Sequence, residues 1–129
     1  MKRFLIFIWS LISISIFNCE SSSGKNVTQL SPKEFQSFLK EDTQLVDVRT
    51  PKEFTEDHIN YAENINFLSE DFSSSIDKLD KEKPVFIYCR SGKRSGKSVA
   101  EFQKVGFTKI YELEGGILKW KSEGFKTIK

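Results

Sequence analysis

The chain has 129 residues, of which 12 are Phe and 29% are charged, and its formal net charge is +2. This length has room for one ordinary domain, and the charges form no basic block or stripe, which argues against a nucleic-acid partner. Two cysteines are too few for a disulfide scaffold and lack the spacing of a zinc site, while a single histidine excludes a multi-histidine centre, so we expect no metal and no organic cofactor.

The first 18 residues have the pattern of an export signal. Lys2 and Arg3 precede an apolar run over residues 4–17, which is short for a membrane span and typical of a secretory signal. Without these two cations the chain keeps 18 basic residues against 18 acidic ones, so the part after the signal is formally neutral.

Cys19 stands at the end of the apolar run and precedes a Ser/Gly stretch. The arrangement resembles a bacterial lipoprotein signal, although Phe17 and Asn18 depart from the small residues usual before the cysteine. The resemblance implies a signal peptide over residues 1–18, lipidation of Cys19, a tether over residues 19–26, and an exported protein anchored in a membrane at the periplasmic face or the cell surface. Cleavage by an ordinary signal peptidase and an uncleaved short anchor are the alternatives.

From residue 27 to residue 129, short β-like runs alternate with helical ones. Segments 31–34 and 50–53 carry the same helix-start signal, a capping box with Pro at the first helical position. Further helices are expected over residues 69–79 and 95–105 and after residue 116, and strands over residues 45–48, 62–67, 84–88 and 109–113. The run at 84–88 is apolar and unbroken, which predicts a central strand covered on both faces. The alternation predicts a three-layer α/β domain with a mainly parallel sheet of about five strands flanked by helices.

Cys89 follows that central strand at its carboxyl end, where open α/β sheets place their ligands. The loop after it runs straight into a helix, whose N-terminus offers unpaired N–H groups, and Gly92 lets successive N–H groups converge on one point. Three nearby cations are Arg90, Lys93 and Arg94. All these effects favour the thiolate, so Cys89 is the expected nucleophile. A small buried apolar cysteine and a disulfide with Cys19 are the alternatives.

Three blocks of the sequence together resemble the single-domain rhodaneses, a family of sulfurtransferases. The segment CRSGKRS, from Cys89 to Ser95, matches the active loop of that family. Residues 47–62, with Asp47-Val48-Arg49 and His58-Ile59, resemble its N-terminal signature, and LEGGILKW over residues 113–120 resembles its C-terminal one. Two residues of the middle block depart from the pattern, because Asp57 and Tyr61 stand where the family often has Gly. These departures concern local backbone geometry more than chemistry.

The resemblance implies a rhodanese-like fold and a two-step sulfur transfer. The Cys89 thiolate would attack the outer sulfur of a small anionic donor such as thiosulfate, and cyanide or a cellular thiol would then remove that sulfur from the resulting persulfide. The N–H groups of the loop, from Arg90 through Ser91 and Gly92 to Ser95, would hold the persulfide, while Arg90 and Lys93 attract the donor.

Four charged or titratable residues receive supporting roles. Arg94 is expected to point toward Asp47 and fix the loop, with a solvated surface cation as the alternative. Arg49 is either a donor-facing cation or part of a structural ion pair. His58 is expected to stabilise a turn or support the site, because a thiolate that has already formed needs no base.

Two other functions fit parts of this pattern. A cysteine phosphatase or an arsenate reductase also uses a thiolate in a cationic loop but places an arginine six residues after the cysteine. Here Arg94 is the fifth residue after Cys89, which shortens the loop by up to ~3.5 Å and favours closure around a single sulfur. The second alternative is a non-catalytic rhodanese-like module that binds a partner or senses sulfur species, although such a module is expected to lack the cysteine or the cationic loop. The sequence indicates no particular protein partner.

Overall fold

The structure, a computed structural model, describes residues 26–129. The predictions for the signal peptide, for Cys19 and for residues 19–25 of the tether lie outside the described residues. Between residues 26 and 129, every helix is too short or too polar to traverse a bilayer.

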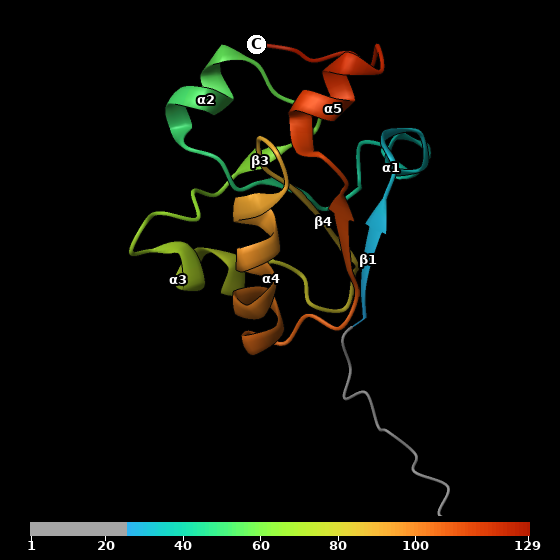
Figure 1. Cartoon of the computed structure of the whole chain (residues 1–129). Coiled ribbons are helices and arrows are strands. Elements are labelled where there is room, and N and C mark those ends of the chain that lie inside the picture. Colours follow the sequence, from blue (N-terminus) through green and yellow to red (C-terminus); the bar gives the residue numbers. More distant parts are fainter. Residues whose placement is uncertain (1–25) are drawn as a thin grey trace, which may run out of the picture.

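Five parallel strands form one central sheet in the spatial order β1-β5-β4-β2-β3 (Figure 1). Along residues 26–129 strands and helices alternate as β1 (Val27–Leu30), α1 (Pro32–Phe38), β2 (Leu45–Asp47), α2 (Pro51–Glu56), β3 (Glu63–Asn64), α3 (Phe72–Asp77), β4 (Val85–Tyr88), α4 (Lys93–Lys104), β5 (Ile110–Leu113) and α5 (Gly116–Ser122). The strand β4 occupies the middle of the sheet and is buried along its whole length, as its apolar sequence predicts.

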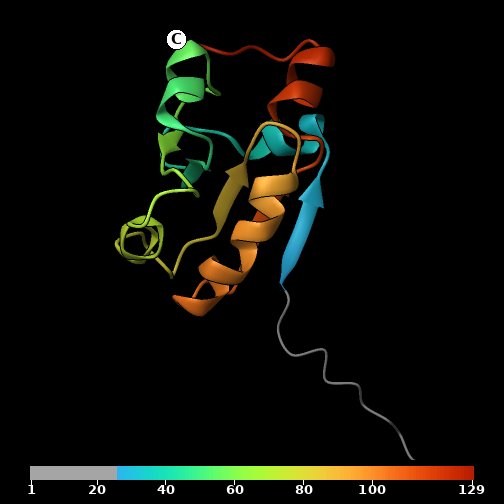
Figure 2. The same ribbon diagram turned by 60° about the vertical axis from the view of Figure 1, so that its left-hand side comes forward.

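Helices cover both faces of the sheet, which confirms the expected three-layer α/β architecture (Figures 1 and 2). On one face α3 and α4 contribute Phe72 and Phe102 to a hydrophobic cluster. On the other face α1 and α5 contribute Phe35 and Trp120 to a second cluster. Successive strand residues point to opposite faces, so β4 supplies side chains to both clusters.

The two predicted helix-start signals begin helices at the expected residues. The helix α1 starts at Pro32, where the Ser31 hydroxyl accepts the N–H of Glu34. The helix α2 starts at Pro51, where Thr50 and Glu53 complete a capping box in both directions. Side-chain acceptors satisfy N–H groups that the first helical turn leaves unpaired, which is why these boundaries are readable from sequence.

Two elements are shorter than the sequence pattern predicts. The strand expected over residues 62–67 is reduced to β3, an edge strand that pairs only with β2. The helix expected over residues 69–79 is reduced to α3, because the side chain and carbonyl of Asn66 accept the N–H groups of Leu68 and Ser69 and hold the preceding segment in a turn. In contrast, α4 begins at Lys93, two residues earlier than expected.

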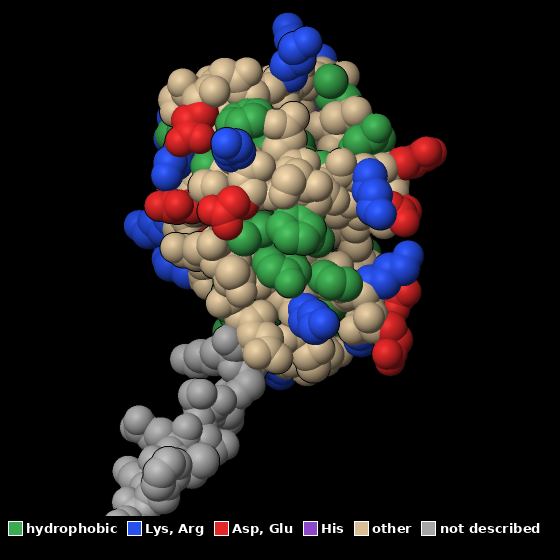
Figure 3. Space-filling model, turned by 90° about the vertical axis from the view of Figure 1, so that its right-hand side faces the viewer, with side chains coloured by type: hydrophobic (Ala, Val, Ile, Leu, Met, Phe, Trp, Pro, Cys, Tyr) green, Lys and Arg blue, Asp and Glu red, His purple; other side chains and the backbone are tan. Residues whose placement is uncertain are grey.

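Hydrophobic side chains gather on the side of the molecule where α1 and β1 lie (Figure 3). At the end of α1, the ring of Phe38 stacks on Tyr111 and packs at a tilt against Phe86, and 46% of Phe38 is exposed. The rings of Phe86 and Tyr111 also stack on each other, so the three aromatic side chains cover one another on this face. The carboxyl ends of the strands hold the candidate site.

Candidate active site

Cys89 lies immediately after β4, at the carboxyl end of the middle strand of the sheet. It is a free cysteine and is almost completely buried, with 1% of its surface exposed. Its sulfur meets two donors, the backbone N–H of Gly92 at 3.1 Å and the hydroxyl oxygen of Ser95 at 3.4 Å. The thiol is therefore held beneath the loop that follows it.

The loop closes over the sulfur because Gly92 adopts a left-handed conformation with φ of 100°. This conformation favours glycine, and it directs the N–H of Gly92 back toward Cys89 while its carbonyl accepts the N–H of Gly96 at 3.0 Å in the first turn of α4. Among the described backbone N–H groups, only that of Gly92 meets the sulfur. Several loop N–H groups were expected to converge on the sulfur, and one of them, that of Gly92, contacts the free thiol.

The helix α5 holds the loop from the other side. The N–H groups of Ile117 and Leu118 donate to the carbonyls of Cys89 and Arg90 at 2.9 and 3.1 Å. Gly116 makes this approach possible, because a Cβ atom there would collide with the Arg90 carbonyl group. From the sequence, Gly116 is only part of the LEGGILKW segment, and its role in holding the active loop becomes visible in the tertiary structure.

Arg94 pairs with Glu53 and not with Asp47, so the predicted Arg94–Asp47 contact is wrong. Two parallel hydrogen bonds of 2.6 and 2.8 Å join the guanidinium to the carboxylate. The hydrogen bond from Arg94, together with smaller contributions from Thr50, lowers the pKa of Glu53 to about 2 against the opposing effect of partial burial. The capping box at the start of α2 orients the Glu53 carboxylate, and this brings α2 and the active loop together.

Asp47 instead forms an ion pair with Arg49, two residues further along the chain. The guanidinium of Arg49 donates to both carboxylate oxygens at 2.7–3.0 Å, and both side chains are buried. Although burial opposes it, hydrogen bonding and the charge of Asp47 raise the pKa of Arg49 above its usual range. Arg49 also donates to the carbonyl of Asp57 at 2.6 Å, so of its two predicted roles the geometry matches the structural ion pair.

His58 lies in the turn after α2. Its ring stacks on that of Phe54 with centroids 3.8 Å apart, and its Nδ1 lies 2.9 Å from the Phe54 carbonyl oxygen. Its backbone forms a two-way bridge with Ile128 near the C-terminus. These contacts hold the turn and the C-terminal segment, and none of them reaches Cys89.

The other loop residues face solvent. Arg90, Ser91 and Lys93 are exposed. Within residues 26–129, neither the Arg90 nor the Lys93 side chain forms a hydrogen bond or an ion pair. Both cations are free to meet an anion that approaches Cys89. Within the same range, no group of three or more His, Cys, Asp and Glu side chains gathers into a possible metal site.

The site also contains a carboxyl group that the sequence analysis does not identify. Glu112 on β5 is 4% exposed, and its Oε1 atom lies 2.7 Å from the hydroxyl oxygen of Ser95, which is fully buried. An acidic residue inside an otherwise apolar strand is the signal that could have pointed to it.

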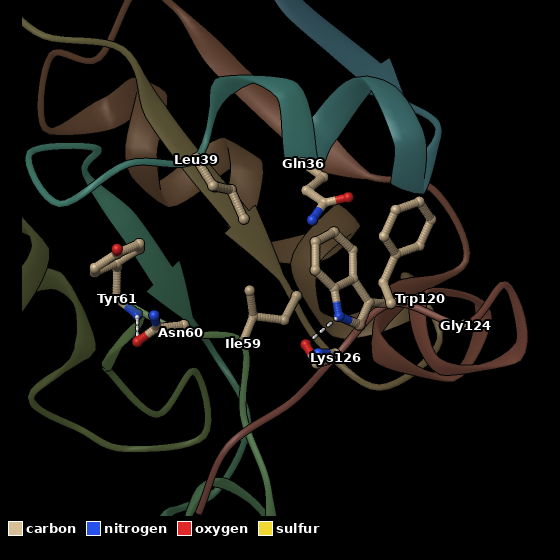
Figure 4. A pocket seen from close by; sticks show the side chains of 9 residues that line it. Gln36, Leu39, Ile59, Asn60, Tyr61, Trp120, Gly124 and Lys126 are labelled. Carbon is tan, nitrogen blue, oxygen red and sulfur yellow. Dashed lines mark hydrogen bonds between the residues drawn. The ribbon is translucent and has the colours of Figure 1, made fainter.

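A hollow of about 480 Å³ opens near the C-terminal end of α5 (Figure 4). Gln36, Ile59, Tyr61 and Trp120 contribute to its lining, and no residue of the active loop does. Tyr61 stands at its edge with φ of 73°, a left-handed conformation in which the related pattern often has Gly. The predicted effect of this departure on the local backbone is thus visible.

The rhodanese-like domain model matches residues 31–123, and the chain belongs to this family. The solved structures it resembles include a rhodanese-related protein from Thermoplasma volcanium, with a TM-score of 0.69 and 25% identity over 78% of this chain and 97% of that one. A rhodanese-like domain protein from Staphylococcus aureus gives a TM-score of 0.66 and 27% identity, over 79% of this chain and 98% of the other.

Relatives by sequence include two uncharacterized bacterial proteins and a thiosulfate sulfurtransferase. The chain is 38% identical over 110 residues to the uncharacterized protein slr1261 of Synechocystis and 40% identical over 91 residues to the uncharacterized protein YqhL of Bacillus subtilis. These matches span 84% and 70% of this chain but 60% and 70% of the relatives' own lengths. The thiosulfate sulfurtransferase GlpE of Pseudomonas aeruginosa is 28% identical over 73% of this chain and 84% of its own. Sulfurtransferases are therefore among the relatives of this chain.

Proposed function

We propose that the protein is a sulfurtransferase that carries a sulfane sulfur on Cys89 as a persulfide. The position of the Cys89 sulfur carries this proposal: it lies at the carboxyl end of β4, against the N–H of Gly92. The exposed cations Arg90 and Lys93 suit an anionic donor, and the similarity to a thiosulfate sulfurtransferase supports the same chemistry.

In the first step, the Cys89 thiolate attacks the outer sulfur of a donor such as thiosulfate. A sulfur–sulfur bond to Cys89 forms while the bond to the inner sulfur breaks, and sulfite leaves with the electron pair. In the second step, cyanide or a thiolate attacks the terminal sulfur, and Cys89 departs as a thiolate. The N–H of Gly92 stabilises negative charge on the Cys89 sulfur without having to reorganise.

The phosphatase and arsenate reductase alternatives are weakened by the place of Arg94. In such enzymes an arginine of the loop has to meet a tetrahedral oxyanion. Here both terminal nitrogens of Arg94 already bind Glu53, and the loop is one residue shorter than that pattern requires. A donor that presents a single sulfur to Cys89 fits this arrangement better.

Sulfur transfer is tested with the full chain in mild detergent, supplied with thiosulfate and cyanide. We expect thiocyanate to form with the unaltered chain and with Cys19→Ala, which removes the other cysteine and serves as the matched control. Cys89→Ser should form none. If the unaltered chain is inactive, mass spectrometry after thiosulfate treatment decides: an added sulfur on Cys89 supports a carrier that needs a specific acceptor, and an unmodified Cys89 contradicts the proposal in favour of a binding or sensing module.

We also propose that Cys19 is lipidated and anchors the domain to a bacterial membrane from the exported side. The apolar run before Cys19 and the Ser/Gly stretch after it support this reading. After expression in a bacterial host, the protein should fractionate with membranes and its first mature residue should be a cysteine bearing diacylglycerol. Cys19→Ala should abolish the modification. A wild-type chain that is unmodified and soluble would contradict the anchor.

A further inference from the structure

A buried carboxyl group lies beneath the active loop and takes no part in the transfer steps described above. Glu112 is 4% exposed, and its Oε1 atom would be 4.0 and 3.6 Å from Cβ atoms placed on Gly92 and Gly96. Gly92 in the loop and Gly96 in the first turn of α4 thus both lie close to the carboxyl group. Within residues 26–129, no lysine or arginine forms an ion pair with Glu112, and its recorded side-chain partner is the neutral hydroxyl of Ser95. A buried charge with so little compensation is costly, so the group needs a physical explanation.

The explanation lies in a continuous chain of polar atoms from the carboxyl group to the nucleophile. Ser95 Oγ is 2.7 Å from Glu112 Oε1 and 3.4 Å from Cys89 Sγ. A hydroxyl has one proton to donate and can accept another hydrogen bond at the same time. When Ser95 donates to an ionised Glu112, it can accept the S–H of Cys89. When it donates to a Cys89 thiolate, it can accept the O–H of a protonated Glu112.

We propose that Ser95 and Glu112 form a proton relay that converts the Cys89 thiol into the attacking thiolate. The S–H bond breaks and its proton passes to Ser95 Oγ, while the hydroxyl proton of Ser95 passes to Glu112 Oε1. The electron pair of the S–H bond stays on sulfur, and the reverse transfer restores the thiol after the second step. The relay rests on the proposed sulfur transfer for its purpose, since the thiolate is what attacks the donor.

An N–H donor and several cations lie near the sulfur, whereas the side-chain partner of the carboxyl group is the neutral hydroxyl of Ser95. The sulfur meets the N–H of Gly92, and the neighbouring Arg94 is a cation whose pKa is raised chiefly by its hydrogen bond to Glu53 and, to a smaller extent, by Cys89. Exposed Arg90 and Lys93 add positive charge from the loop. On the β1 side, the residue paired with Glu112 is the neutral Gln29. The relay therefore moves one buried negative charge toward the cations without adding a second.

The relay predicts an unusual pH dependence for the alkylation of Cys89 by iodoacetamide in the full chain. Two coupled groups lose their protons in two steps that belong to the pair, so the wild-type rate should be nearly constant over the interval between these steps. In Glu112→Gln the amide oxygen can still accept from Ser95 but cannot hold the proton. The rate should then follow a single titration, rising about tenfold per pH unit below its midpoint with no constant interval. Ser95→Ala keeps both titrating groups but removes the hydroxyl that joins them, so its profile should also change, with a lower alkylation rate within the constant interval.

Glu114→Gln is the matched control, because Glu114 lies two residues further on, pairs with Lys119 at 3.3 Å and is exposed. Its alkylation profile should match that of the wild type. A wild-type profile without a constant interval, or one that is unchanged in both Glu112→Gln and Ser95→Ala, overturns the relay even if sulfur transfer is intact. Alkylation needs no sulfur donor, so a constant interval in a chain that forms no persulfide would support the relay while contradicting the proposed function.

Discussion

At the scale of single residues, the pairing of Arg94 with Glu53 determines how the active loop is held. The two residues stand 41 positions apart in the chain and meet through two short hydrogen bonds. Glu53 is oriented by the capping box at the start of α2, so a local helix signal also prepares a long-range contact. The chemistry of the loop thus depends on a residue outside it.

We expect Glu53→Gln to lower the free energy of unfolding at pH 7 by about 1–2 kcal/mol, since it removes the charge of a partly buried pair. The pKa of Glu53 is lowered from 4.5 to about 2, so the pair stabilises the fold fully above pH 4.5 and loses this effect as the pH falls toward 2. The difference between wild type and variant should therefore shrink over that interval, as measured by urea unfolding at several pH values.

Glu34→Gln is the control for this measurement. Glu34 has the same third position in α1, but among the described residues its carboxylate accepts a hydrogen bond from Ser31 alone, and we expect a change below about 0.5 kcal/mol. Equal stabilities of Glu53→Gln and wild type at pH 7 would contradict the importance assigned to the Arg94 pair.

Tyr61 offers a second test at the residue scale. Its left-handed backbone costs about 1–2 kcal/mol for a residue with a Cβ atom, and half of its side chain is exposed. Glycine normally destabilises a folded segment relative to alanine, but here we expect Tyr61→Gly to be more stable than Tyr61→Ala by about 1 kcal/mol. Both variants lose the same ring contacts, so thermal or urea unfolding of the pair isolates the backbone effect. A less stable glycine variant would show that the left-handed conformation is absent in solution.

At the scale of elements, the start of α5 is the feature on which the active loop depends most directly. Its first N–H groups bind the carbonyls of Cys89 and Arg90, which is possible only because Gly116 has no side chain. We expect Gly116→Ala to cost at least about 2 kcal/mol of stability and to slow thiosulfate:cyanide transfer about tenfold or more, because the loop has to shift.

Gly124→Ala is the control for Gly116→Ala, because it strains the backbone without the collision of the new Cβ atom with the active loop. Gly124 also has a positive φ, of 86°, but a Cβ atom there would meet nothing within 4 Å. This variant should lose about 1 kcal/mol and keep its transfer activity. If both alanine variants behave alike in the transfer assay, the close approach of α5 to the loop has no effect on activity.

At the scale of the whole molecule, the sheet separates two hydrophobic clusters that contribute to stability independently. Phe35 lies in the cluster under α1 and α5, and Phe102 lies in the cluster under α3 and α4. Both are fully buried, so Phe35→Leu and Phe102→Leu should each cost about 1–2 kcal/mol. Because the two rings belong to separate clusters on opposite faces of the sheet, the double variant should equal the sum of the single ones within about 0.5 kcal/mol, as measured by urea unfolding. A larger deviation would show that the layers are coupled.

The strength of local signals decides how much of this fold can be predicted from the sequence. Helix starts at Pro32 and Pro51 were predictable because the capping groups lie within four residues of one another. The short length of β3 was not, because an edge strand with a single neighbour ends where pairing with β2 ends. The first strand, β1, carries no delimiting signal of its own, and its pairing with β5 defines it.

The sequence by itself determined the alternation of strands and helices, the central place of residues 84–88 and the position of Cys89 at the end of that strand. Apolar periodicity, caps and a glycine-containing loop are local properties that a single segment carries. Only the tertiary structure decided which polar side chains pair around the site: Arg94 with Glu53, Arg49 with Asp47, and Ser95 with Glu112. Several cations and carboxylates compete for these partnerships, and the packing of α2 and β5 against the active loop selects among them.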